Sequence, residues 1–175
     1  MGLHLEDLDD VTRQLMVSEI DADGEGGGFY LSNHLSGEGQ ETWPRLLREA
    51  AAEGNDDSLA QTLRNNRSFK THYERRKPKG GYTTAAVPVT APDTLAQSQF
   101  NMYYMRALAL RAKSEGRTLT IYRARESNNP RPESEAMIGQ QLNPDTVLEV
   151  LRRTKGVEPD INIPMPNSGL SLRLT

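Results

Sequence analysis

The sequence contains no cysteine and little histidine. Without cysteine, the chain can form neither a disulfide nor a thiolate metal site. Only three histidines occur, His4, His34 and His72, and none of them pairs with another histidine or a carboxylate in a recognised metal-binding pattern. The sequence therefore predicts no metal site and no bound cofactor.

Long apolar segments are also missing. No run approaches the ~18 apolar residues of a membrane-spanning helix. The first ten residues, MGLHLEDLDD, are acidic, whereas a signal peptide begins with basic residues. Apolar residues make up 35% of the sequence, which is low for a globular protein and indicates a modest core. We therefore expect an intracellular protein with no membrane partner.

Charge is unevenly distributed along the chain, although the net charge is only −3. Residues 1–66 contain fourteen acidic and four basic side chains, whereas residues 67–131 contain thirteen basic and four acidic ones. Three interpretations fit this pattern. The two parts pack together within one chain, they join neighbouring copies head to tail, or the basic part faces nucleic acid.

The densest basic segment is RRKPKGG, residues 75–81. Its charged side chains attract phosphate, and its two glycines allow the backbone to approach a ligand closely. Tyr73 and Tyr82 flank it as stacking groups. An acidic surface, in the same chain or in a neighbour, is an equally suitable partner. The candidate interaction residues are Arg75, Arg76, Lys77 and Lys79.

The first half of the chain has helical periodicity. Apolar residues predict a helix over about 6–21, followed by a glycine-rich break at 24–28. Pro44 suits the first turn of a second helix that ends at Gly54. Asn55 then caps a third helix over about 56–64. These segments predict an acidic, helical first half.

The second half alternates between strands and helices. Residues 82–89 favour a strand, which Pro88 confines to a sheet edge or an extended arm. The strongest helix covers 93–115, where Phe100, Tyr103, Ala107 and Leu110 form one apolar stripe. Further strands are predicted at 118–124 and 170–174, with a helix between Asn143 and Gly156.

These elements predict an α+β fold with a small mixed sheet, a long packing helix and an acidic helical N-terminal half. We expect three regions. Residues 1–66 form the acidic helical region, residues 67–92 a basic loop and extended arm, and residues 93–175 an α+β core with an extended C-terminal segment.

A second cluster of charged residues follows the strand at 118–124 and comprises Arg123, Arg125, Arg131, Glu133 and Glu135. Two carboxylates two residues apart beside arginines could hold Mg²⁺ in a nuclease or transferase site. An arginine on a strand with a later Glu-x-Glu also suggests nicotinamide chemistry. However, no lysine follows at nuclease spacing and no Ser-Thr-Ser strand accompanies the arginine. Surface or intersubunit ion pairs are the alternative.

Three segments of the chain resemble small uncharacterised proteins of bacterial tailed phages and prophages. They are KPKGGYTTAAVPVTAPDTLAQSQFNMYYMRALALRA, TLTIYRARESNNPRPESEAMIG and PNSGLSLRL. The resemblance spans residues 77–174, and the segment LEDLDDVTRQLM shows a weaker similarity. It supplies no catalytic motif. It implies a phage-associated role and a location in a virion or the bacterial cytoplasm.

We therefore predict a structural or assembly protein, such as a head-associated, decoration or connector component of a phage particle. Its partners would be copies of itself or neighbouring structural proteins. Segregated charge suits contacts between neighbouring copies, and Pro/Gly-rich segments suit arms that extend over them. Two alternatives remain open. One is a nucleic-acid-binding accessory protein that uses residues 75–79, and the other is a metal-dependent nuclease or transferase that uses Glu133 and Glu135.

Overall fold

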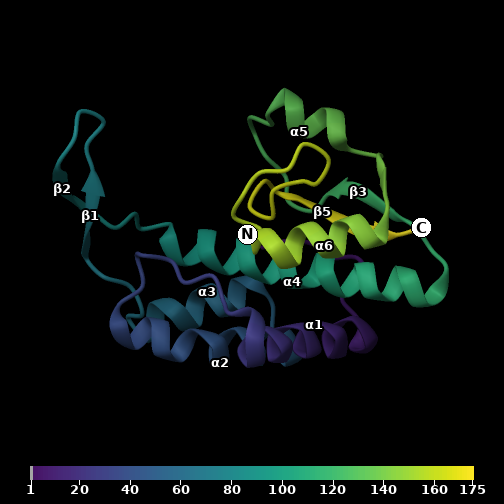
Figure 1. Ribbon diagram of the computed structural model, residues 1–175, viewed down its shortest axis with the longest axis horizontal. Coiled ribbons are helices and arrows are strands. Elements are labelled where there is room, and N and C mark those ends of the chain that lie inside the picture. The colour runs from purple at the N-terminus through teal and green to yellow at the C-terminus, as the bar shows by residue number, and fades with distance from the viewer. Residues whose placement is uncertain (1) are drawn as a thin grey trace.

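In the computed structural model, which describes residues 2–175, the helix α4 (Ala91–Glu115) lies between two layers (Figure 1). One layer contains the helices α1 (Asp10–Ala22), α2 (Gly37–Glu53) and α3 (Asp56–Asn65). The other contains the helix α6 (Pro144–Thr154) and a sheet of β3 (Leu119–Arg123), β4 (Gln141–Leu142) and β5 (Leu170–Leu174). The short helix α5 (Pro132–Met137) lies on the side of this sheet away from α4 (Figure 1).

The α+β class is confirmed, with helices dominating over two small sheets. The core sheet has the order β4-β3-β5, and its strands are antiparallel throughout rather than mixed. The predicted strand at 82–89 appears as β2 (Tyr82–Ala86), which pairs only with β1 (His72–Arg76) in a separate hairpin. Both faces of β2 are largely exposed, so this strand has no apolar face to bury against the core.

The helix α4 is buried along an unbroken stretch from Leu95 to Ala109. Phe100, Tyr103 and Ala107 are buried as predicted, whereas Leu110 is only half-buried. A single apolar stripe fits a helix at a surface, but α4 is covered from both sides. Polar residues on its buried faces are therefore paired inside the protein. Asn101, for example, donates to the carbonyl oxygens of Pro166 at 3.0 Å and Leu170 at 2.9 Å.

Two helices of the first half begin at different residues from those predicted. The helix α1 begins at Asp10, because the Asp9 side chain accepts a hydrogen bond from the Thr12 amide at 3.0 Å. The helix α2 begins at Gly37, capped by Ser36, so Pro44 lies inside it rather than in its first turn. The prediction for Pro44 was wrong because burial of Trp43 and its neighbours outweighs the hydrogen bond that proline removes.

The acidic first half packs directly onto the second half. Apolar side chains of α1, α2 and α3 join those of α4, α6 and the core sheet in one continuous cluster that extends from Met16 to Leu174. The chain before α1 also crosses the sheet, where the His4 amide donates to the Ala124 carbonyl at 2.7 Å. One apolar core therefore holds both halves together.

Candidate functional site

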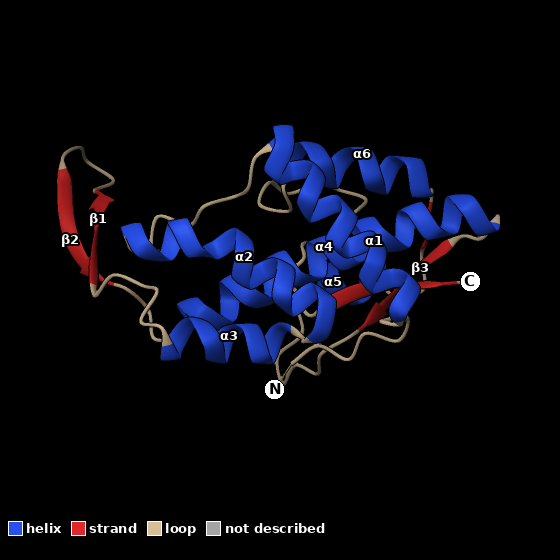
Figure 2. Ribbon diagram, turned by 90° about the horizontal axis from the view of Figure 1, so that it is seen from below, coloured by secondary structure: helices blue, strands red, loops and turns tan. Residues whose placement is uncertain are grey.

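The basic segment 75–81 forms the tip of the hairpin β1–β2. Arg75 and Arg76 belong to β1, Arg76 lies opposite Tyr82, and residues 77–81 form the connecting loop. The Lys77 amide donates to the Gly81 carbonyl at 2.9 Å, and Gly80 and Gly81 both have positive φ angles. Glycine adopts such angles without strain, so the sequence can make this tight turn. Both ribbon views show the hairpin standing away from the helical body (Figure 1, Figure 2).

Within residues 2–175, the four cations of the hairpin have no ionic partner. The ion pairs of this range involve other basic residues, and all four hairpin cations are exposed. Other basic residues of the 67–131 part do pair with the acidic half: Arg106 binds Glu19 and Asp23, and Arg111 binds Asp9. Some of the basic residues of 67–131 thus form ion pairs with the acidic half of the chain, whereas the cations of the hairpin do not.

Among the described residues, the hydrogen bonds and the ring contact that join the hairpin to the body lie at its base. The Lys70 amide donates to the His34 carbonyl at 2.8 Å, and the Val87 amide donates to the Thr71 carbonyl at 2.9 Å. The His34 ring meets the Tyr73 ring edge-on, with 4.4 Å between centroids. Tyr82, nearer the tip, is 68% exposed. The outer part of the hairpin is therefore a free surface with cationic and aromatic side chains.

The second predicted cluster lies around a cavity of about 500 Å³ beside the end of β3. Arg123, Arg125, Arg131 and Glu133 line this cavity, together with residues 160–170 of the irregular segment before and into β5. The side chain of Glu135 instead forms an ion pair with Arg123. Four of the five predicted residues therefore line one cavity, and the fifth is bound to one of them.

The two carboxylates of this cluster are not arranged as a metal site. Glu135 is engaged by the guanidinium of Arg123, which competes with a metal ion for its oxygens. Across residues 2–175, no group of three or more histidine, aspartate or glutamate side chains is placed to hold a metal ion. The cavity offers mainly guanidinium groups, which bind anions.

Sequence reasoning missed a buried ionic cluster centred on Arg106. The Arg106 guanidinium donates to Glu19 at 2.7 Å and to both carboxylate oxygens of Asp23 at 2.7 and 3.1 Å. Tyr103 donates to Asp23 at 2.6 Å, and the Lys155 ammonium lies 3.1 Å from the same carboxylate. Arg152 binds the outer side of Glu19. A signal was present, because an arginine in the middle of an apolar helix needs buried carboxylates.

The cations of this cluster keep its carboxylates ionised. Burial alone would raise the pKa of Asp23, but hydrogen bonds from Arg106 and Tyr103 outweigh it and hold that pKa below its usual value. The pKa of Glu19 is likewise lowered, because Arg152 and Arg106 together outweigh the effect of burial. Burial and the hydrogen bond to Asp23 raise the pKa of Tyr103. The cluster holds the π-helical turn Asp23–Gly27 against α4. Its residues line neither the arginine-lined cavity nor the two hollows beside it, which indicates a structural role.

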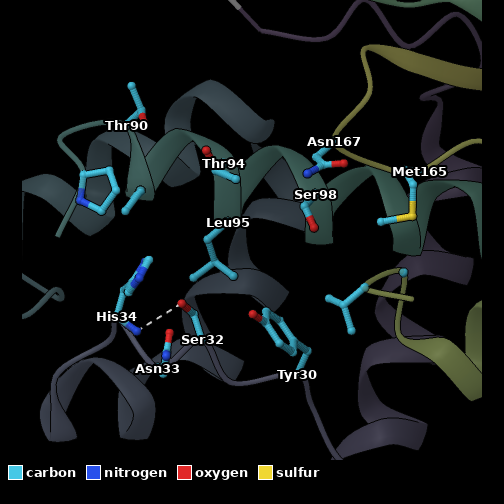
Figure 3. Close-up of a pocket in the computed structure, with 14 residues that line it drawn as sticks. Tyr30, Ser32, Asn33, His34, Thr90, Thr94, Leu95, Ser98, Met165 and Asn167 are labelled. Carbon is cyan, nitrogen blue, oxygen red and sulfur yellow. Dashed lines mark hydrogen bonds between the residues drawn. The ribbon is translucent and has the colours of Figure 1, made fainter. Parts of the chain in front are cut away.

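A smaller hollow of about 340 Å³ lies near the base of the hairpin, and its lining is uncharged (Figure 3). Ser32, Thr94 and Ser98 contribute hydroxyl groups, and the His34 amide donates to the Ser32 hydroxyl at 3.2 Å. Asn167 borders this hollow, the arginine-lined cavity and a third hollow that Asp56, Asp57 and Asp93 line. The charged and uncharged depressions therefore adjoin one another on this part of the surface.

Comparison of the chain with protein-family models, with curated proteins and with solved structures found no match. Within residues 2–175, none of the helices combines the length and the apolar character that a membrane span requires.

Proposed function

We propose that this protein is a structural assembly protein of the tailed-phage type, which binds neighbouring subunits through the β1–β2 hairpin. The observation that carries the proposal is the exposure of four cations on a hairpin that stands away from the body (Figure 1, Figure 2). These cations pair with no acidic side chain of the described residues 2–175. Charge of this density attracts an oppositely charged surface.

The same chain offers a complementary acidic surface. Exposed carboxylates of the first half take part in no ion pair within residues 2–175, namely Asp10, Glu25, Glu38, Glu41, Glu53 and Asp57. The hairpin of one copy can meet the acidic half of the next, which is a heterologous contact. Contacts of this kind build rings or filaments, the forms that connector and head-associated proteins need.

The hairpin itself also favours a role in contacts between molecules. An isolated two-stranded hairpin is only marginally stable in water, because it has no second layer to cover it. In β1 and β2 only Tyr73 and Ala85 are even half-buried. A partner that covers Tyr82 and the basic side chains would supply the missing layer.

Nucleic acid is the second candidate partner. The exposed Tyr82 lies opposite Arg76 in the hairpin register, which places an aromatic ring beside a guanidinium. Aromatic rings stack on bases while cations contact phosphates, so this pair suits a single strand. This candidate uses the same residues as the assembly contact, and the two must be separated by experiment.

Native mass spectrometry of the purified protein, alone and with the proteins encoded beside its gene, tests the proposal. We expect complexes that weaken with salt and that the double variant Lys77→Gln/Lys79→Gln disrupts. The matched control is Arg45→Gln/Arg153→Gln, which also removes two exposed cations but lies on α2 and α6. A monomer in every mixture at low and physiological salt would refute the assembly role.

A parallel titration with a fluorescent single-stranded oligonucleotide tests the second candidate. If all four cations contact phosphates, the logarithm of affinity should fall against the logarithm of salt with a slope of about −3. The double variant should then reduce the magnitude of that slope by about 1.5, because each contact with a single strand contributes about 0.7. Absence of binding at low salt removes this candidate and leaves the assembly proposal intact.

A further inference from the structure

Two adjoining hollows lie beside the first turns of α4. One is the uncharged hollow near the base of the hairpin. The other, which we call the acidic hollow, is lined by Asp56, Asp57 and Asp93, and each hollow has a volume of about 340 Å³. The two hollows share the lining residues Thr90, Thr94 and Asn167. A single binding partner can therefore place one group in each of them.

The uncharged hollow suits the side chain of a tyrosine. Its apolar lining is accessible, because Tyr30 and Met165 are only half-buried (Figure 3) and Val157 is 38% exposed. The Ser32 hydroxyl accepts a hydrogen bond from the His34 amide and donates to no atom of the described residues. A tyrosine ring covers apolar surface of this kind, while its hydroxyl group accepts a hydrogen bond at the polar end.

The acidic hollow suits a cation. Asp93 is paired with Arg64, so its charge is already balanced. Asp56 and Asp57 remain, against the single cation Arg125 in the lining. Two carboxylates and one guanidinium leave an excess of one negative charge, and the exposed Asp57 forms no ion pair within residues 2–175. An incoming guanidinium is attracted to this charge.

A buried amide in the same hollow lacks a partner. Gln97 is only 7% exposed and lines the acidic hollow, yet its side chain makes no hydrogen bond to any residue of the described chain. A buried polar group without a partner is costly. A guanidinium carries several N–H donors in a planar fork, so one such group can bind the Asp57 carboxylate and the Gln97 amide oxygen together. The unpartnered amide thus points to a donor from another molecule.

The tip of the hairpin carries a matching pair of groups. Arg76 lies directly opposite Tyr82 in the register of β1 and β2. Side chains of directly opposite residues lie on the same face of a sheet, with Cβ atoms about 5 Å apart. Both side chains are exposed, and the hairpin stands away from the body of its own chain (Figure 2). They are therefore available to the hollows of another copy.

We propose that the hairpin of one copy docks on these two hollows of a second copy, with Tyr82 in the uncharged hollow and Arg76 in the acidic one. This docking rests on the proposed assembly function and names the surface that receives the hairpin. An aromatic ring beside a guanidinium matches an uncharged hollow beside an acidic one. Tyrosine and arginine are also among the residues that most often carry the binding energy of protein interfaces.

Sedimentation velocity of the full chain, with charge-reversed variants, tests this docking. Arg76→Glu changes the tip and Asp57→Arg changes the hollow. Each should weaken self-association at least about tenfold, because each places like charges together. A mixture of the two variants should associate again, because one retains an intact hollow and the other an intact hairpin. The double variant Arg76→Glu/Asp57→Arg should also recover association, because its opposite charges are exchanged rather than lost. Variants that merely failed to fold would show neither recovery.

A neutral variant tests the uncharged hollow separately. Tyr82→Ala should weaken self-association about tenfold or more, because it removes the ring that fills this hollow. The matched controls are Arg153→Glu on α6 and Glu41→Arg on α2, which reverse exposed charges outside the hairpin and both hollows. Both controls should associate as the wild type does.

The same measurements separate this docking from the assembly role itself. If Lys77→Gln/Lys79→Gln weakens the complexes but Asp57→Arg and Tyr82→Ala do not, the assembly role stands and the docking surface is wrong. If the wild type associates only with proteins encoded beside its gene, docking on a second copy is likewise wrong. Equal effects of Glu41→Arg and Asp57→Arg would also overturn the docking, because the attraction would then be diffuse. A monomer in every mixture refutes both proposals.

Discussion

Replacing Arg106 with methionine should destabilise the protein strongly, because it leaves two buried carboxylates with fewer partners. The side chains of Glu19 and Asp23 are only 5% and 6% exposed, and Arg106 makes hydrogen bonds to both. Removing one partner of a buried ion pair costs about 3 to 5 kcal/mol. Glu19 retains Arg152, and Asp23 retains Lys155 and Tyr103. We therefore expect a loss of about 3 kcal/mol, at the lower end of that range.

Urea unfolding followed by fluorescence measures this loss, because the sole tryptophan, Trp43, is fully buried and reports on the core. The control Arg152→Met removes a cation whose side chain is 47% exposed, so it should cost about 1 kcal/mol or less. Adding Glu19→Gln and Asp23→Asn to Arg106→Met should recover part of the stability, because the uncompensated buried charges disappear. A loss below about 1 kcal/mol for Arg106→Met would contradict the assignment of a buried ionic cluster.

The same cluster predicts the direction of the acid dependence. The folded protein holds the pKa values of Glu19 and Asp23 below their ordinary values. The stability that they contribute is therefore complete above the unfolded pKa values and is lost as the pH falls through the folded ones. The wild type should lose stability steadily below about pH 4, since carboxyl groups titrate near there when unfolded. The variant with all three substitutions should show a shallower dependence.

Two further predictions concern the backbone. Gly39→Ala should destabilise the protein by about 1 to 3 kcal/mol in the same urea assay, because the new Cβ would lie 2.0 Å from the Ser68 carbonyl oxygen. Gly37→Ala, at a site with open space, is its control, and an equal effect of both would contradict the close approach. Trypsin should cut first within residues 75–79, because these cations lie on an exposed hairpin with little to hold it. Mass spectrometry of the first fragments checks this, and first cleavage within α4 would contradict it.

The sequence predicted those elements whose signals are local. The capped helix α3, the helix α6 and the alternating strand β5 appear close to their predicted bounds, because caps, periodicity and alternation act over a few residues. The strand β1 was missed because its sequence, HYERR, has neither alternation nor an apolar face and exists through pairing with β2. The strand propensity of single residues does not predict such pairing between distant segments.

The ionic cluster and the arginine-lined cavity could not be predicted from local sequence signals either, because both depend on long-range contacts. Arg106 lies 87 residues from Glu19 in the sequence, and the cavity combines the loop after β3 with a C-terminal segment that was predicted only as extended. The sequence did identify the charged residues of the cavity, since the predicted candidates included Arg123, Arg125, Arg131 and Glu133. Their arrangement depends on the path of residues 160–170, which the packing of α4 and β5 determines.

Charged side chains are paired inside the body of the protein but unpaired on the hairpin. This contrast supports a structural role for the body and a binding role for the hairpin. Inside the body, every charge of the Arg106 cluster has a partner, because an unpaired buried charge would cost several kcal/mol. On the hairpin, four like charges stay close together without a partner within residues 2–175. Their mutual repulsion destabilises the hairpin and contributes nothing to the core. A partner with negative charge relieves that repulsion, so the feature that weakens the isolated hairpin strengthens its contact with a neighbouring molecule.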